Sequence, residues 1–177
     1  MPLDIQTLHF LNGLAGRSPL LDELIVFCAS YLAYIMIAAF LGFLFLSRYS
    51  RREKLEIFFV TAVSSIVTRF GVVEIIRFFY HRPRPFSMQP VHQLLTDTAW
   101  SFPSGHAAFF FAMATAVGFY NRKWGIILFV AATLVTVSRV IAGIHYPSDI
   151  LAGALLGIAV AYAVRFFARK ISEKHPH

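Results

Sequence analysis

Three separate stretches of the sequence carry arginine, histidine, serine or aspartate at short spacings. They cover residues 77–85, 103–106 and 138–149. Arginine binds phosphate oxygens through paired hydrogen bonds, and histidine can act as a nucleophile or as a proton donor. The set therefore suits an anion of the phosphate type. The candidate residues are Arg77, Arg84, Ser104, Gly105, His106, Arg139, His145 and Asp149.

Two prolines indicate how the backbone would present these side chains. Pro103 suits the first turn of a helix and leaves the N–H groups of residues 104–106 without partners inside that helix. Such a helix start attracts anions before any side chain is counted. Pro147 likewise opens a helix, with His145 just before it and Asp149 in its first turn. An aspartate so placed can hold the imidazole through its Nδ1–H.

The elements that must position these residues are membrane-spanning helices. The 177 residues are 58% hydrophobic and 14% charged, and the mean hydropathy is +0.65, whereas an ordinary soluble domain carries about 25% charged residues. This composition excludes disorder, and the single Cys28 excludes a disulfide scaffold. We predict an all-α bundle of five to six helices in one membrane-embedded domain over 1–177, with an amphipathic N-terminal helix. The predicted spans are about 24–46, 55–80, 103–120, 124–144 and 147–167.

The positive charge of the chain reports its orientation in the membrane. The net charge is +7, and ten of the sixteen lysines and arginines lie in the turns near 48–54 and 122–123 and in the C-terminal residues 165–174. With five spans these three places share one side, which the positive-inside rule assigns to the cytoplasm. We therefore expect the candidate site to face outside a multi-pass cell-membrane protein. Because membrane topology accounts for the excess of positive charge, nucleic-acid binding is not needed to explain it.

The N-terminal residues 1–16 are too short to span and carry no basic region typical of a signal peptide. An interfacial helix lying on the membrane is one interpretation, although Asp4 interrupts its apolar face. A frayed terminus is the alternative.

Other residues invite a role that the sequence does not decide. Arg69 and Glu74 could line the site or form a structural pair within the second span. Gly153 and Gly157 form G-x-x-x-G, which favours close helix packing within the monomer over dimerisation. Arg82 also precedes a proline, but no basic residue lies seven positions before it. No role is assigned to His9, His81 or His92.

The ordered motifs resemble those of the type 2 phosphatidic acid phosphatases, integral membrane lipid phosphate phosphatases related in fold to vanadium haloperoxidases. The family pattern is K-x6-R-P, then P-S-G-H, then S-R-x5-H-x3-D. The second and third motifs match at every specified position, and the resemblance covers residues 54–168. In the first motif Arg77 stands where the family has lysine, so a planar fork replaces a point charge.

The resemblance implies a reaction and a role for each residue. It implies that His145 attacks phosphorus and becomes a phosphohistidine, that Asp149 orients it, and that His106 protonates the leaving oxygen. It implies no metal or other cofactor, because arginines supply the positive charge. The phosphoryl oxygens would be held by Arg77, Arg84, Ser104, Gly105 and Arg139.

The substrate is inferred from a narrower resemblance, to one subgroup of the family. The compact chain and the Arg-Pro-Arg-Pro-Phe stretch at 82–86 are similar to bacterial undecaprenyl-diphosphate phosphatases, which serve peptidoglycan synthesis. Phosphatidylglycerophosphate or phosphatidate is the alternative substrate. A non-catalytic lipid-phosphate binder or transporter is the alternative of another class, but binding alone has no need of a His–Asp pair beside a second histidine. Monomer and dimer are both open.

Overall fold

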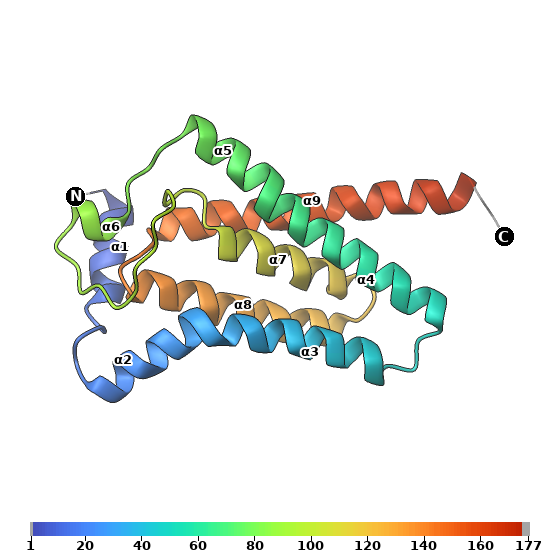
Figure 1. Cartoon of the computed structure of the whole chain (residues 1–177), viewed down its shortest axis with the longest axis horizontal. Helices are drawn as coiled ribbons and strands as arrows, with labels where there is room; N and C mark the ends of the chain where they lie inside the picture. The colour runs from blue at the N-terminus through green and yellow to red at the C-terminus, as the bar shows by residue number, and fades with distance from the viewer. Residues whose placement is uncertain (1, 175–177) are drawn as a thin grey trace.

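The protein is an all-helical bundle, as predicted, and the computed structural model describes residues 2–174. The chain forms nine α-helices and two π-helical segments over that range. Figure 1 shows them as a bundle with its long helices side by side. In chain order they are α1 (Leu3–Asn12), α2 (Pro19–Val26), η1 (Phe27–Tyr31), α3 (Leu32–Leu46), α4 (Arg51–Ile66), η2 (Val67–Val72), α5 (Val73–Phe79), α6 (Pro85–Met88), α7 (Gly105–Gly118), α8 (Arg122–Ile141) and α9 (Pro147–Lys174).

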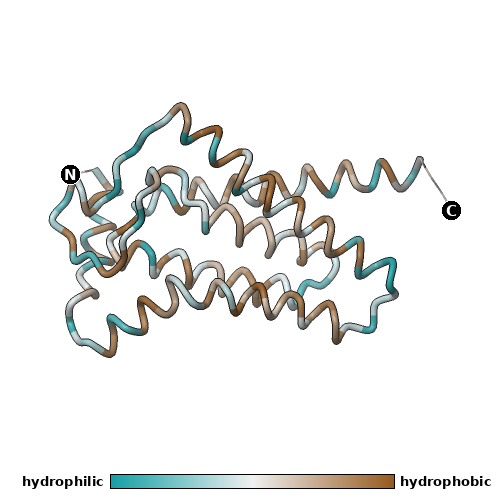
Figure 2. Tube along the Cα trace, viewed as in Figure 1, coloured by the Kyte–Doolittle hydropathy of each residue, from teal (hydrophilic) through white to brown (hydrophobic). Residues whose placement is uncertain are grey.

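Over the described range, four continuous helical segments are long and apolar enough to cross a membrane. Two of these contain a π-helical segment: α2, η1 and α3 run on without a break, as do α4, η2 and α5. Figure 2 shows hydrophobic residues along the helices and hydrophilic ones gathered at the turns. α7 is shorter, with 14 residues, which correspond to a length of about 21 Å. The four long segments are Pro19–Leu46, Arg51–Phe79, Arg122–Ile141 and Pro147–Ile171.

Helix starts explain where the observed boundaries differ from the predicted ones. The first span begins at Pro19 rather than near residue 24, because the Ser18 side chain caps it and Pro19 fits its first turn. The second begins at Arg51, where Ser50 and Glu53 form a reciprocal capping box. In both cases charged residues in the first turn hide the true start from a search for apolar runs.

α7 forms the centre of the bundle and packs against α8, α9 and α4. Small residues permit this close packing. A β-carbon at Gly153 of α9 would lie 2.5 Å from the carbonyl oxygen of Ser104, and one at Gly157 would lie 2.5 Å from that of Ala108. The G-x-x-x-G pair therefore lets α9 lie directly on α7 within one chain, as the sequence suggested.

The two ends of the bundle differ in character. One end holds α1, α6, the residues 80–104 that lead to α7, and the junction between α8 and α9 (Figure 1). The opposite end holds the α3–α4 and α7–α8 turns. The basic turns and the candidate motifs thus lie at opposite ends, which is the arrangement that the charge pattern predicts.

The N-terminal segment forms a helix that packs on the bundle. α1 contacts α8 and α9, and Leu8 is fully buried. Asn12 ties its end to the loop, since its side chain donates to the carbonyl oxygens of His92 and Ile141, both at 2.8 Å. Leu3 and Phe10 are exposed on the outer side of this helix. Met1 lies outside the described residues.

Candidate active site

His145 and Asp149 form a buried pair at the junction between α8 and α9. The imidazole Nδ1 lies 3.3 Å from Oδ2 of Asp149, and neither side chain has more than 1% of its surface exposed. The Tyr146 N–H also donates to Oδ2, at 2.9 Å. The other ring nitrogen, Nε2, lies 3.4 Å from Nη1 of Arg84. The aspartate therefore occupies one side of the ring and leaves Nε2 facing Arg84.

Three buried arginines from different parts of the chain surround this histidine. Arg77, Arg84 and Arg139 have side chains between 4% and 7% exposed. Backbone carbonyl oxygens fix the three guanidinium groups, which limits their conformational freedom before a ligand arrives. Arg77 Nη2 donates to Pro103 at 3.1 Å, Arg84 Nη1 to Ile144 at 2.8 Å and Arg139 Nη1 to Ala29 at 3.2 Å.

Each of these guanidinium groups keeps one buried nitrogen without a hydrogen-bond partner among residues 2–174. These nitrogens are Nε of Arg77, Nη2 of Arg84 and Nε of Arg139. A buried donor without a partner is unfavourable by about 1–3 kcal/mol, and more when it is charged. The free donors of Arg77 and Arg139, together with the guanidinium of Arg84 beside His145, favour an anion with several oxygens.

A loop carboxylate lies within this cationic site. Asp97 Oδ2 lies 2.8 Å from Nη2 of Arg84, where the two groups form an ion pair without the alignment of a hydrogen bond. The same oxygen lies 3.3 Å from Nη2 of Arg139, which donates a hydrogen bond to it. Burial would raise the pKa of Asp97, but Arg84, the Ala99 amide and Arg139 together hold that pKa below its usual value. Burial lowers the pKa of Arg84, against the opposing effect of Asp97. An anion that binds both arginines would compete with this carboxylate.

The start of α7 brings the second motif to the same place. The Ser104 side chain caps the helix by accepting from the Ala107 N–H, and the Ser104 N–H donates to the carbonyl oxygen of Asp149 at 3.0 Å. This bond ties the first turn of α7 to the first turn of α9. Gly105 is buried, and His106 is half-buried beside it. All eight residues predicted from the sequence thus come to one end of the bundle.

Besides Asp97, four polar residues of this site were not predicted: Arg82, Ser101, Asp4 and Ser148. Arg82 Nη1 donates to Oδ1 of Asp149 at 2.7 Å, and its Nη2 donates to Asp4 of α1 at 2.7 Å. Ser101 donates to the other Asp149 oxygen at 2.5 Å. Asp4 also accepts from the backbone N–H and the hydroxyl of Ser148, at 2.9 and 2.6 Å. The charge that interrupted the apolar face of α1 therefore binds the start of α9.

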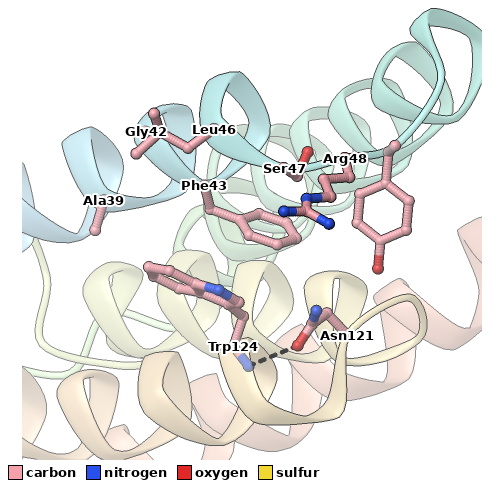
Figure 3. Close-up of a pocket in the computed structure, with 9 residues that line it drawn as sticks. Ala39, Gly42, Phe43, Leu46, Ser47, Arg48, Asn121 and Trp124 are labelled. Atoms are coloured by element: carbon pink, nitrogen blue, oxygen red, sulfur yellow. Dashed lines mark hydrogen bonds between the residues drawn. The ribbon is translucent and has the colours of Figure 1, made fainter.

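A pocket at the opposite end of the bundle lacks these features. It has a volume of about 690 Å³ and lies between α3 and the start of α8. Figure 3 shows Phe43, Trp124 and Arg48 around it, with the Trp124 backbone N–H donating to Asn121. Its nine lining residues include no histidine, aspartate or glutamate. The motif residues therefore mark the better candidate for chemistry.

The fold and the three motifs define an integral membrane phosphatase, and comparison with known proteins gives the family. The PAP2 superfamily matches residues 53–172, and the chain belongs to that superfamily. It is a multi-pass membrane protein and a lipid phosphatase of the PAP2 type.

Individual relatives cover nearly the whole chain. The chain is 30% identical over 175 residues to a Bacillus licheniformis protein named bacitracin transport permease protein BcrC, covering 98% of this chain and 84% of the relative. It is 32% identical over 155 residues to undecaprenyl-diphosphatase BcrC of Bacillus subtilis (strain 168), covering 86% and 77%. The crystal structure of Aquifex aeolicus LpxE superposes with a TM-score of 0.73 at 28% identity, over 93% of this chain and 95% of that one.

Proposed function

We propose that the protein hydrolyses undecaprenyl diphosphate at the outer face of the membrane, through a phosphohistidine formed on His145. The observation that carries this proposal is the asymmetric setting of the imidazole, with Asp149 at Nδ1 and Arg84 at Nε2. A relative named undecaprenyl-diphosphatase, 32% identical to this chain, supports the choice of substrate. Phosphatidylglycerophosphate and phosphatidate remain the alternative substrates.

The first step transfers the terminal phosphoryl group to the enzyme. Nε2 of neutral His145 donates its electron pair to phosphorus, and the bond from phosphorus to the bridging oxygen breaks. That oxygen takes the bond's electron pair and a proton from His106, so undecaprenyl phosphate leaves. Asp149 stabilises the imidazole as it becomes positively charged. In the second step water attacks phosphorus and gives a proton to His106. The bond from phosphorus to Nε2 breaks, its electron pair returns to the imidazole of His145, and inorganic phosphate leaves.

The arginines supply the charge stabilisation that this reaction requires. Arg77, Arg84 and Arg139 would hold the phosphoryl oxygens, and the first turn of α7 adds the backbone N–H of Gly105. The Ser104 N–H, which the sequence also suggested for this role, instead donates to the carbonyl oxygen of Asp149. Preorganised positive charge of this kind can perform the role that Mg²⁺ has in other phosphoryl-transfer enzymes. We therefore expect hydrolysis without added divalent metal.

The separation of the two bundle ends supports an outward-facing site. The basic α3–α4 turn lies at the end opposite to His145, and such turns favour the cytoplasm. Single cysteines at the exposed Ser50 and Gln93, in a Cys28→Ser background, would test this with a membrane-impermeant thiol reagent on intact cells. We expect labelling at position 93 and none at position 50. The reverse pattern would contradict the outward-facing site.

Phosphate release from a panel of lipid phosphates tests the function itself. Purified protein in excess EDTA should release phosphate from undecaprenyl diphosphate faster than from phosphatidylglycerophosphate or phosphatidate. His145→Ala should abolish the activity, whereas His92→Ala at an exposed histidine should retain it. Binding without phosphate release would favour a carrier or binding protein. A strict requirement for Mg²⁺ would contradict the proposed mechanism.

A further inference from the structure

Arg69 is a charged residue inside the second span, and the proposed reaction assigns it no task. It lies in the π-helical segment η2, flanked by α4 and α5. A charged side chain at membrane depth is unfavourable, and such residues commonly serve function. Its ion-pair partner is Glu74, and the two side chains keep 27% and 48% of their surface exposed. Both side chains of the pair therefore lie partly on the protein surface.

Glu74 of α5 links Arg69 to the phosphate site. Arg69 and Glu74 are five apart, and Glu74 Oε1 is also 3.5 Å from Nη1 of Arg77. One carboxylate thus lies between an arginine of the phosphate site and an arginine outside it. Arg69 extends the cationic surface by one further guanidinium.

A pocket connects Arg69 with His106. It has a volume of about 220 Å³ and lies between η1–α3, η2 and the start of α7. Arg69 crosses Gly105 so closely that a β-carbon at Gly105 would overlap its guanidinium group. Polar atoms of Arg69 and His106 therefore face one space, and the rest of its lining is largely apolar: Ala33, Tyr34, Ile37, Phe70, Phe109 and Phe110.

The leaving group must enter this pocket if His106 protonates it. In a lipid diphosphate the leaving group begins with a second phosphate and continues as a hydrocarbon chain. The pocket lining combines the guanidinium of Arg69 and the imidazole of His106 with apolar side chains, and so provides for both parts of such a leaving group. A lipid monophosphate has no charged group to place beside Arg69.

We propose that Arg69 binds the phosphate that remains with the lipid, and that it thereby makes the site selective for lipid diphosphates over lipid monophosphates. This assignment rests on the proposed function and specifies its substrate class. As the bridging oxygen departs, negative charge grows on the leaving phosphate, and the guanidinium stabilises it through charge-assisted hydrogen bonds. Glu74 holds Arg69 in place and partly neutralises it between turnovers.

Selectivity between two lipids with the same tail tests the assignment. Farnesyl diphosphate and farnesyl monophosphate would be compared as substrates of the purified full-length protein in detergent. In Arg69→Ala we expect the ratio of kcat/KM values, diphosphate to monophosphate, to fall about 10- to 100-fold, the effect of losing a hydrogen bond to a charged group. Arg69→Lys should recover part of the ratio. The matched control is Arg165→Ala, which removes an arginine paired with Glu56 on another helix and should leave the ratio unchanged.

The possible results separate this assignment from the function on which it rests. If the wild type hydrolyses both lipids and Arg69→Ala leaves the ratio unchanged, the assignment is overturned and the phosphatase mechanism stands. An equal loss on both lipids would also overturn it, because a merely structural role predicts that result. If Arg69→Ala is not monodisperse, Arg69→Gln gives the same ratio test with a side chain that still forms hydrogen bonds. A wild type active on the monophosphate alone would contradict both proposals.

Discussion

Replacing Arg82 with glutamine should slow the chemical step without weakening substrate binding. Arg82 contacts Asp149 rather than the phosphate site, and the same guanidinium reaches Asp4 of α1 and lies 3.8 Å from the centre of the Tyr146 ring. It thus connects the N-terminal helix to the aspartate that orients His145. The substitution removes this connection and leaves Ser101 and the Tyr146 N–H as donors to Asp149.

The magnitude follows from the burial of the two partners. Asp149 is 0% exposed and Arg82 is 21% exposed. A hydrogen bond to a charged partner in such a setting contributes about 1.5–3 kcal/mol. If that free energy maintains the geometry of the transition state, kcat should fall about 10- to 100-fold. The Arg82–Asp4 contact is more accessible, with both side chains above 20% exposed, and an ion pair of this kind contributes about 0.2–1 kcal/mol. Asp4→Asn should therefore lower kcat by no more than about fivefold.

Steady-state kinetics on one soluble lipid phosphate would give kcat and KM for Arg82→Gln and Asp4→Asn, and would show whether the first loses more kcat than the second. The control is Arg17→Gln, since Arg17 is an exposed arginine of the N-terminal region that bonds only its own segment at Gly13 in the described structure. We expect the control to match the wild type. A rise in KM with unchanged kcat for Arg82→Gln would refute the reasoning, because it would mean that Arg82 contacts substrate. Wild-type kcat in that variant would refute it as well.

Three further predictions concern the pH range, the loop carboxylate and the helix packing. Burial lowers the pKa of His145 to about 4, against the opposing effect of Asp149, so the imidazole stays neutral above that pH. The kcat on an activated aryl phosphate should therefore fall only as the pH drops through about 4. A fall in kcat centred near pH 6.5 would contradict this. Asp97→Asn should strengthen competitive inhibition by inorganic phosphate about threefold or more, since the carboxylate occupies the site arginines; weaker inhibition would show that it organises them instead. Gly153→Ala should destabilise the protein by about 1–3 kcal/mol and lower its unfolding temperature, because the new β-carbon would lie 2.5 Å from the Ser104 carbonyl oxygen; Gly42→Ala, where nothing lies within 4 Å, is its control.

The local signals in the sequence predicted much of this molecule. Apolar runs predicted the helical bundle, and motif spacing selected eight residues that the fold brings to one end. Each of these signals is carried by neighbouring residues in one segment. Pro103 and Pro147 could be interpreted as helix starts for the same reason, since the constraint of a proline on its own turn is local.

The contacts that the sequence did not predict join segments far apart in the chain. Asp97 is a single carboxylate in an irregular loop, and nothing in its neighbours indicates that it meets Arg139. Asp4 and Arg82 are 78 residues apart, and their pairing depends on how α1 packs on the bundle. The π-helical segment η2 leaves no recognisable pattern in the sequence either. Arg69 and Glu74 were recognised as polar residues of the span, but their position beside the site was not.

Rapid-quench trapping of the phosphoenzyme tests the central claim most directly. The purified protein would be mixed with substrate labelled in the terminal phosphate, quenched under alkaline conditions that preserve phosphohistidine, and digested to locate the label. We expect label on His145 in the wild type and none in His145→Ala. We also expect His106→Ala to turn over about 10²- to 10⁴-fold more slowly, the usual contribution of general acid–base catalysis. Label on His106, or label that persists in His145→Ala, would contradict the account of this site.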